Sequence, residues 1–393
     1  METIKDTTSI VEVLRYIVAN YGAEIYKEKQ RLSNLIADLY RGEEKKKRVY
    51  RRAIMDDSLS VKVHGLSLIP LSQRKAYYQR LIFAFSDLNF YSEDFGKQVV
   101  DGFVSGLNMP VSLSQECEDL IKKAMEGDAV AQNRLGVRYY DGKGIEQDYV
   151  EAVKWYRKSA EQGNSSAQNR LGVCYYKGNG VEQDYVEAVK WQRKSAEQGN
   201  DWGQYNLANC YYDGKGIEQD YSEAVKWFRK SAEQGNSSAQ NRLGVCYYKG
   251  NGVEQNYEEA IKWFRKSAER GNDWGQYNLA NCYYNGKGVS QDYVEAVKWY
   301  RKSAEQGNSS AQNRLGVCYY KGNGVEQNYS EAVKWQRKSA EQGNDWGQYN
   351  LANCYFDGKG VEQDDEEGEK WMRKSAEQGN EDALAFLEEH GMV

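Results

Sequence analysis

Cysteine is the residue type in this 393-residue chain that could bind a metal or carry redox chemistry, and six of the seven cysteines recur at a fixed interval. They lie 36 residues apart, at Cys174, Cys210, Cys246, Cys282, Cys318 and Cys354. The chain has no C-x-x-C motif, and both histidines, His64 and His390, lie outside the series, so the spacing typical of zinc ligands is missing. In a stack of repeats, neighbouring cysteines would lie beyond the reach of a disulfide. The pattern therefore predicts small buried apolar residues.

Recurrent carboxylates are the second group that could carry chemistry, as a general acid and base. They occur in the pattern Asp/Asn-x-x-Glu, at Asp148/Glu151, Asp184/Glu187, Asp220/Glu223, Asn256/Glu259, Asp292/Glu295, Asn328/Glu331 and Asp364/Glu367. This spacing is typical of a capping box, in which both side chains accept hydrogen bonds from backbone N–H groups left free at a helix start. Because capping occupies these carboxylates, the sequence predicts no enzyme activity, no metal and no cofactor.

Two helices per repeat would position these side chains. Tryptophans spaced by 36 residues define seven repeats over residues 127–378, followed by a half-repeat at 379–393; they are Trp155, Trp191, Trp227, Trp263, Trp299, Trp335 and Trp371. In the first helix of a repeat, Ala167, Leu171 and Tyr175 share one face, and Gly178 ends the helix. The second helix runs from the capping Asp or Asn to the glycine of "AEQGN". Because one short pair cannot bury its apolar stripe, we expect the repeats to stack.

The second helix of the last repeat differs from the others. It has Asp365, Gly368 and Glu369 where most of the other repeats have Tyr, Ala and Val. A helix face with no further repeat to cover it should be polar, so the sequence predicts that this repeat caps the array.

The repeat consensus resembles the Sel-one-like repeat (SLR) family, a relative of the tetratricopeptide repeats. The full pattern is carried by Ala167, Leu171, Gly172, Tyr175, Gly178, Gly180, Val181, Asp184, Tyr185, Ala188, Trp191, Ala196 and Gly199. The resemblance implies an all-α fold, a right-handed α/α superhelical solenoid of seven 36-residue helix-turn-helix repeats. It also implies a non-enzymatic scaffold or adaptor that binds a protein or peptide in the concave groove of the solenoid. Secreted members of the family have two cysteines per repeat, whereas this chain has one.

The first helices alternate between two versions, "SSAQNRLGVCYYKGNG" and "DWGQYNLANCYYDGKG", so the full period is 72 residues. Most differences lie on one helical stripe, next to the core stripe. By the resemblance, the first helix lines the groove, which predicts a partner-binding set of Asn169, Arg170, Tyr176, Trp202, Tyr205, Asn206, Asn209, Tyr212, Arg242, Tyr277, Arg314 and Tyr349. Aromatic residues with Arg are typical of interface hot spots. Two interpretations stay open for Trp202, Trp274 and Trp346, which either face the groove or pack on the previous repeat.

Charge and composition narrow the class of partner. The net charge is −5, and residues 1–126 carry 19 basic against 18 acidic side chains, so neither part has the positive field of a nucleic-acid binder. No apolar stretch is long enough to span a membrane, and Glu12 and Arg15 interrupt the only candidate signal peptide. We therefore expect a cytoplasmic, bacterial protein whose partner is a protein or peptide. Neither a membrane nor a small molecule is indicated.

Residues 1–110 lie outside the repeats. Their apolar residues have helical spacing and predict a small all-helical domain, joined to the repeats by a linker and a helix within residues 111–126. A basic run in this domain contains Lys45, Lys46, Lys47, Arg48, Arg51 and Arg52. The run either forms a solvated helix face or binds nucleic acid or an acidic partner, with the repeats as a recruiting arm. This second role is the alternative to a groove that binds protein.

Overall fold

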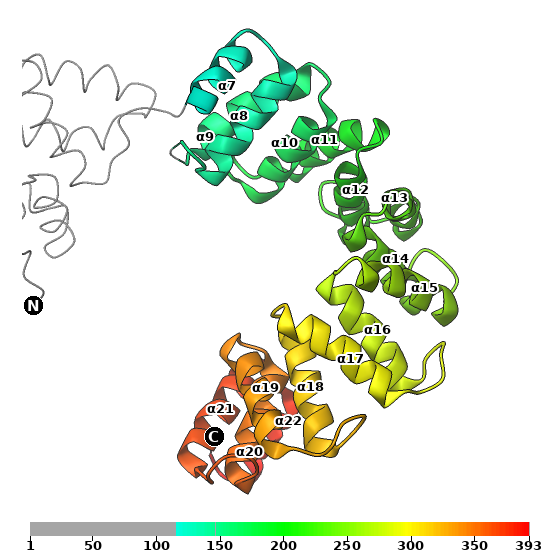
Figure 1. Cartoon of the computed structure of the whole chain (residues 1–393), viewed down its shortest axis with the longest axis vertical. Coiled ribbons are helices and arrows are strands. Elements are labelled where there is room, and N and C mark those ends of the chain that lie inside the picture. The colour runs from blue at the N-terminus through cyan, green and yellow to red at the C-terminus, as the bar shows by residue number, and fades with distance from the viewer. Residues whose placement is uncertain (1–114, 146, 393) are drawn as a thin grey trace, which may run out of the picture. The chain divides into compact units, whose positions relative to one another are not determined.

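The computed structural model of the chain describes residues 115–145 and 147–392, and every regular element in these residues is an α-helix (Figure 1). The all-α repeat fold is thereby confirmed. The helices are α7 (Gln115–Met125), α8 (Ala129–Asp141), α9 (Tyr149–Glu161), α10 (Ser165–Lys177), α11 (Tyr185–Glu197), α12 (Asp201–Asp213), α13 (Tyr221–Glu233), α14 (Ser237–Lys249), α15 (Tyr257–Glu269), α16 (Asp273–Asn285), α17 (Tyr293–Glu305), α18 (Ser309–Lys321), α19 (Tyr329–Glu341), α20 (Asp345–Asp357), α21 (Asp365–Glu377) and α22 (Glu381–Glu389).

The chain divides into two compact units, residues 1–159 and 160–393. In the first unit, the described helix α7 packs on α8. The expected helical domain at 1–110 and the basic run at 45–52 lie outside the described residues. None of the described helices has the length and apolar content that crossing a membrane requires.

The second unit repeats one arrangement of helix pairs. We call its even-numbered helices α10 to α20 the A helices and its odd-numbered helices α11 to α21 the B helices. Each A helix packs on the B helix that follows it, and each B helix packs on the next A helix (Figure 1). Consecutive A helices also contact each other directly in the pairs α10 with α12, α14 with α16 and α18 with α20. These close pairs each join the two versions of the A helix, so the 72-residue period of the sequence is also a period of the packing.

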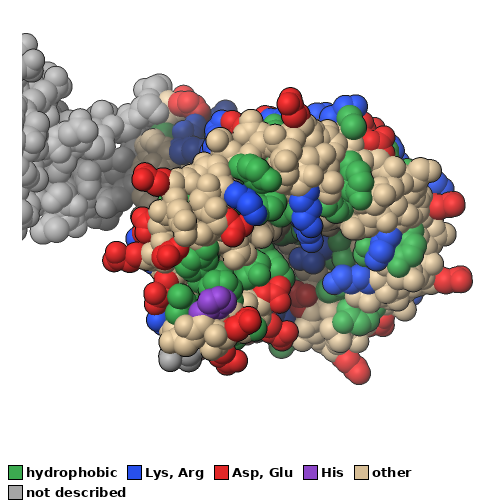
Figure 2. Space-filling view, turned by 90° about the horizontal axis from the view of Figure 1, so that it is seen from below, with side chains coloured by type: hydrophobic (Ala, Val, Ile, Leu, Met, Phe, Trp, Pro, Cys, Tyr) green, Lys and Arg blue, Asp and Glu red, His purple; other side chains and the backbone are tan. Residues whose placement is uncertain are grey.

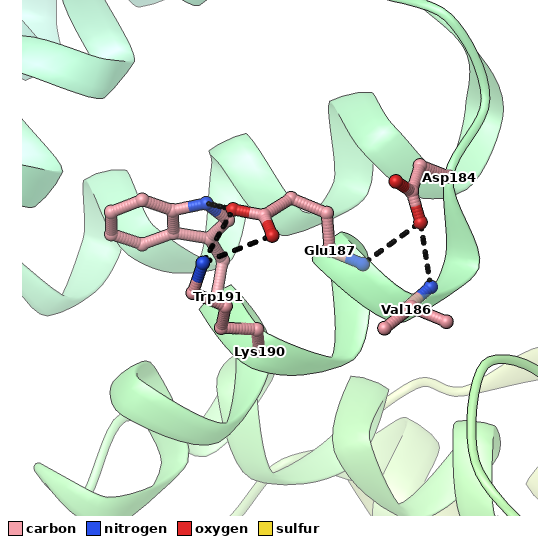
Figure 3. Close-up of polar contacts among 5 residues, drawn as sticks. All are labelled: Asp184, Val186, Glu187, Lys190 and Trp191. Atoms are coloured by element: carbon pink, nitrogen blue, oxygen red, sulfur yellow. Dashed lines mark hydrogen bonds and ion pairs between the residues drawn. The ribbon is translucent and has the colours of Figure 1, made fainter.

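Helix caps differ from the prediction in one respect. Asp184 Oδ1 accepts hydrogen bonds from the N–H groups of Val186 and Glu187 at 2.9 and 3.0 Å, as an N-cap should (Figure 3). The reciprocal bond of a capping box is not made, because the N–H of Asp184 already donates to the carbonyl of Tyr175 at 2.9 Å. The carboxylate of Glu187 instead accepts from Trp191 Nε1 at 2.9 Å and forms an ion pair with Lys190 (Figure 3).

Small side chains fill the space between the helices. The six repeat cysteines are buried and unpaired, which confirms their prediction as small core residues. Gly203 occupies the position at which the "SSAQNRLGVCYYKGNG" version has alanine. It lies against the side chain of Ser195, and a Cβ added to it would be 3.0 Å from the backbone N of Ala196. Helices therefore approach closely at this glycine, as the exchange of alanine for glycine suggested.

The last repeat also departs from the expectation of a polar cap. α21 is covered by α22, whose Ala383 and Leu387 are buried. Gly368 is buried as well, because a Cβ at this position would meet the ring of Phe356, which stacks on Phe386 at 5.0 Å. Gly368 thus makes room for an aromatic contact to the terminal helix, whereas the other two predicted polar residues stay at the surface: Asp365 is exposed, and Glu369 is partly exposed and pairs with Arg373.

One position breaks the polar network that runs through the repeats. In the other repeats of the second unit, a glutamine after the B helix donates to the buried glutamine of the A helix, as Gln342 Nε2 does to Gln312 Oε1 at 2.7 Å. Arg270 occupies the donor position in the fourth repeat, and its guanidinium lies beside Gly235. The Oε1 atom of Gln240 is consequently buried without a hydrogen-bond partner.

Replacing this arginine by glutamine should therefore stabilise the protein. A buried acceptor without a partner costs about 1 to 3 kcal/mol, so we expect Arg270→Gln to raise the free energy of unfolding by about 1 kcal/mol. The reverse exchange at an intact position, Gln342→Arg, should lower it by a similar amount. Denaturant unfolding of both variants measures the change, and an Arg270→Gln protein no more stable than the parent would contradict the assignment.

The buried thiols give a second prediction. Burial raises the pKa of Cys174 to about 11 and that of Cys210, Cys246, Cys282 and Cys318 to about 12, against an ordinary value of 9.0. Since the thiolate is the reactive form, these thiols should resist a thiol reagent in the native protein and react rapidly in denaturant. Rapid labelling of the folded chain would show that the thiols are accessible.

The same rise in the pKa of the thiols makes the free energy of unfolding depend on pH. Above about pH 9 the thiols of the unfolded chain ionise at their ordinary pKa of 9.0, while the folded thiols keep their protons. The unfolded state then binds fewer protons, so these groups should make the free energy of unfolding fall as the pH rises above about 9. Denaturant midpoints measured across this range, compared with a variant that has alanine at the six positions, check the sign.

Candidate protein-binding groove

Two equivalent pockets open on the A-helix face of the second unit. The first has a volume of about 480 Å³ and the second about 500 Å³. The first is lined by Tyr205, Ser238, Asn241, Arg242, Val245, Lys249, Asn272, Trp274 and Asn278. All nine positions recur 72 residues later in the second pocket, together with Tyr320, Gln336, Asn353 and Asp357. Figure 2 shows basic and hydrophobic side chains around a hollow in the surface, with some acidic side chains at its lower edge and many more at the outer margin.

Each pocket is built from three consecutive A helices. In the first, Tyr205 comes from α12, Arg242 from α14 and Trp274 from α16. We call "DWGQYNLANCYYDGKG" the aromatic version of the A helix. The tyrosine therefore comes from one A helix of the aromatic version, the arginine from the next A helix, which has the other version, and the tryptophan from the A helix after that, which again has the aromatic version. A pocket of this composition needs both versions of the A helix in alternation, and it recurs with the 72-residue period.

The tryptophans of the aromatic version lie at the surface. Trp202, Trp274 and Trp346 are 49, 49 and 48 % exposed, and two of them line pockets. Each indole makes an edge-to-face contact with the tyrosine one turn later, as Trp274 does with Tyr277 at 5.7 Å between ring centres. Of the two interpretations left open by the sequence, the structure places these rings on the A-helix face.

The tyrosines behind these indoles are held by the B helix. The ring centre of Tyr205 lies 6.0 Å from that of Phe228, and that of Tyr277 lies 6.1 Å from that of Tyr300. Tyr349 lies partly buried against the core cluster that contains Met372. Their positions are therefore fixed by packing before any partner arrives.

Asparagine pairs join the two versions of the A helix. Asn206 Nδ2 donates to Asn169 Oδ1 at 2.8 Å, and the same 2.8 Å bond recurs in the pairs Asn278 with Asn241 and Asn350 with Asn313. These bonds lie where the A helices contact each other directly. In each pair, the Oδ1 of the donating asparagine and the Nδ2 of the accepting asparagine take no part in this bond. Both atoms lie on the face that carries the pockets. Asn209 is used differently, because its Nδ2 donates to the carbonyl of Tyr205 in its own helix at 3.0 Å.

Two predicted binding residues also serve to join repeats. The hydroxyl of Tyr212 accepts a hydrogen bond from Asn251 Nδ2, in the turn after α14, at 2.7 Å. Burial raises the pKa of Tyr212. The ring of Tyr176 lies 5.3 Å from Lys215 Nζ and packs edge-to-face on Tyr185. The sequence did not indicate this role, because the contacts with Asn251 and Lys215 reach into a turn of the next repeat.

In the "SSAQNRLGVCYYKGNG" version of the A helix, Arg242 and Arg314 contact aromatic groups and form no ion pair with a carboxylate of the described residues. Arg242 lies 6.0 Å from the ring centre of Tyr212. Arg314 is hydrogen-bonded to Tyr277, and although burial lowers its pKa, the neighbouring tyrosines raise it further, so the group stays charged. Among the ion pairs found in residues 160–392, none involves Arg170, Arg242 or Arg314.

The partner-binding set predicted from the sequence missed some of the pocket lining. Lys249 and Lys321 line the two pockets, as do Asn272 and Asn344, which cap the following A helix. The lysines lie on the same helical stripe as the arginines, seven residues later, so the stripe itself was the available signal. The capping asparagines had no such signal, because they precede the helix and belong to no stripe.

The chain is similar to known repeat proteins in both sequence and fold. The Sel1 repeat model matches residues 129–164, 165–200, 203–236, 237–272, 275–308, 309–344 and 347–380. The crystal structure of c5321, a protective antigen of uropathogenic Escherichia coli with an SLR fold, aligns at 40 % identity and a TM-score of 0.57. It covers 81 % of this chain, which spans 66 % of that protein. A Sel1 repeat protein from Oxalobacter formigenes aligns at 34 % identity and a TM-score of 0.57, over 62 % of this chain and 96 % of that one. No curated protein matches.

The asparagine pairs can be tested by a double-mutant cycle. Because a hydrogen bond between side chains contributes about 1 kcal/mol, Asn241→Ala and Asn278→Ala should be non-additive by about that amount in the free energy of unfolding. Asn241→Ala and Asn350→Ala, which are not paired with each other, should be additive and serve as the matched control. Additive effects in both cycles would show that the pair contributes nothing measurable.

Proposed function

The chain belongs to the Sel1 repeat family, and from that premise we propose that it is a non-enzymatic scaffold that binds a protein or an extended peptide across its A helices. Proteins of this family are generally protein-interaction scaffolds. The observation that carries the proposal is the recurrence of one pocket, with a half-exposed tryptophan and an arginine, at an interval of 72 residues.

The chemistry of the pockets favours a polypeptide. Large exposed aromatic rings and arginine are the residues that dominate protein interfaces, because they bury much surface with little loss of conformational freedom. Asparagine amides offer both a donor and an acceptor, which suits the N–H and C=O groups of a peptide backbone. The pockets lie along successive A helices of one unit, so an extended segment could reach both.

The packing behind the pockets supports tight binding. The tyrosines are wedged between an indole and a B helix, and the asparagines are bonded in pairs. Groups that are already ordered lose little entropy when a partner binds, so more of the contact energy appears as affinity.

The lining residues also support a non-enzymatic role in the bacterial cytoplasm. The side chains around both pockets are mainly amides, hydroxyls, aromatic rings and bases, and burial raises the pKa of the thiols on α14 and α18, at Cys246 and Cys318. Free cysteines are typical of reducing compartments. The alternative role for the basic run at 45–52 has no supporting observation, since the run lies outside the described residues.

Removing the exposed indoles tests the proposal. We expect the triple variant Trp202→Ala, Trp274→Ala and Trp346→Ala to lose specific partners captured by the intact chain from its host, with affinities for an isolated partner about tenfold lower or weaker still. Because these rings are half exposed, the variant should fold, which circular dichroism can confirm.

A matched control comes from exposed apolar residues of the B helices. Val186 and Val294 are 67 and 54 % exposed, so Val186→Ala and Val294→Ala remove apolar surface outside the A-helix face. This variant should keep every partner. If the tryptophan variant keeps them as well, or both variants lose the same ones, binding does not occur on the A helices.

A further inference from the structure

Basic side chains on both kinds of helix contact aromatic groups, as Arg242 contacts Tyr212, but the two kinds of helix differ in ion pairs with carboxylates. On the B helices they have partners within the chain: Lys190 pairs with Glu187 at 3.1 Å, Arg193 donates to the hydroxyl of Tyr211 at 2.8 Å, and Lys194 lies 4.3 Å from the ring centre of Trp191. The equivalent ion pair between a lysine and the glutamate three residues before it recurs in each of the other B helices, at 2.5 to 3.1 Å.

The bases that line the pockets have no such ionic partner. In the first pocket, Arg242 and Lys249 form no ion pair among the described residues, and the lining contains no carboxylate. In the second pocket, Arg314 and Lys321 likewise form none, and the single acidic lining residue, Asp357, is paired with Lys359 at 2.8 Å. Both pockets thus hold an excess of positive charge in a chain whose net charge is −5.

We propose that the occupant of this face is an extended, acidic polypeptide segment whose carboxylates pair with Arg242 and Lys249 in one pocket and with Arg314 and Lys321 in the other. This inference rests on the proposed function and names the chemistry of its partner. A bond between a guanidinium and a carboxylate is charge-assisted and about twice as strong as a neutral one, and it is stronger in a half-enclosed pocket than in open water.

The spacing of the pockets defines the pattern of the segment. Between the two arginines lies one A helix of the aromatic version, α16, which contributes Trp274 to the first pocket and Tyr277 to the second. The segment should therefore carry two acidic positions separated by apolar residues that contact these rings. Asparagine amides along the same helices would bind its backbone, which requires an extended conformation with exposed N–H and C=O groups.

Charge also separates an acidic polypeptide from a nucleic acid. A nucleic acid presents a phosphate at every nucleotide and is held by a continuous series of bases. Here the A helices that carry bases on this stripe lie two repeats apart. The A helices between them carry mainly neutral amides and rings, and the stripe also includes the carboxylates of Asp213 and Asp357. Isolated carboxylates fit this arrangement better than an unbroken chain of phosphates.

Selection from a display library of random peptides, with the full chain as the target, tests the inference. We expect the selected peptides to contain two groups of Asp or Glu around an aromatic or aliphatic centre. Fluorescence anisotropy then compares each peptide with a counterpart in which Asp and Glu are replaced by Asn and Gln. The counterpart should bind about tenfold more weakly for each ion pair lost, and the difference should shrink as salt is added.

Matched variants assign the effect to the pockets. Arg242→Gln with Arg314→Gln should bind the acidic peptide at least tenfold more weakly and should prefer it less strongly over its amide counterpart, because Lys249 and Lys321 remain in the pockets. Lys226→Gln with Lys298→Gln removes the same charge from the B helices, where these lysines pair with Glu223 and Glu295, and should leave the affinity unchanged.

The outcomes separate this inference from the proposed function. Peptides that need Trp274 and Trp346 but show no preference for acidic residues would overturn the acidic partner and leave the binding face in place. Peptides unaffected by the tryptophan variant, or no selected peptide at all, would overturn both. Tighter binding of a single-stranded DNA oligonucleotide, lost with Arg242→Gln and Arg314→Gln, would replace the acidic polypeptide by a nucleic acid.

Discussion

The repeats depend on one buried hydrogen bond between neighbours. In the A helices of the second unit a buried glutamine donates to a carbonyl near the end of the preceding helix, as Gln204 Nε2 does to Ala196 O at 3.2 Å and Gln276 Nε2 to Ala268 O at 3.2 Å. The same carbonyl also accepts the N–H of the glycine that follows the helix, as Ala268 O does from Gly271 at 3.0 Å, so it is the buried amide of the glutamine that needs this bond. This bond therefore sets the register of each repeat on the previous one. A serine of the B helix, such as Ser195, adds a bond within the repeat to Ser165 O at 2.7 Å.

This register places the pockets. Because every A helix is held at the same position on its B helix, the same stripe faces outward in each repeat, and residues 72 positions apart become equivalent in space. The alternation of the two versions then decides what each pocket contains, since one version supplies Arg242 and Lys249 while the other supplies Tyr205 and Trp274. A uniform array of either version would have these tryptophans without the arginines, or the arginines without the tryptophans.

The sequence predicted what depends on one helix at a time. The period of 36 residues, the ends of the helices at glycine and the burial of cysteine all follow from local pattern, and the structure has them. It did not predict contacts that depend on how one helix lies against another. The glutamate of the capping motif bonds to Trp191 because a carbonyl of the preceding helix already occupies the N–H that it would otherwise accept from. The exposure of Trp274 likewise depends on how α16 lies against α14, which no single-helix pattern contains.

Unpaired bases are tolerated on this face because stability comes from elsewhere. In a repeat array the free energy of folding is the sum of contributions from the repeats and from their interfaces, and these lie in the buried alanine, leucine and cysteine side chains and in the glutamine bonds. None of these residues lines a pocket. The A-helix stripe is thus free to hold bases and exposed indoles, while its tyrosines and paired asparagines also help to join the repeats. That separation explains how a chain of nearly identical repeats can keep its core constant while its surface alternates.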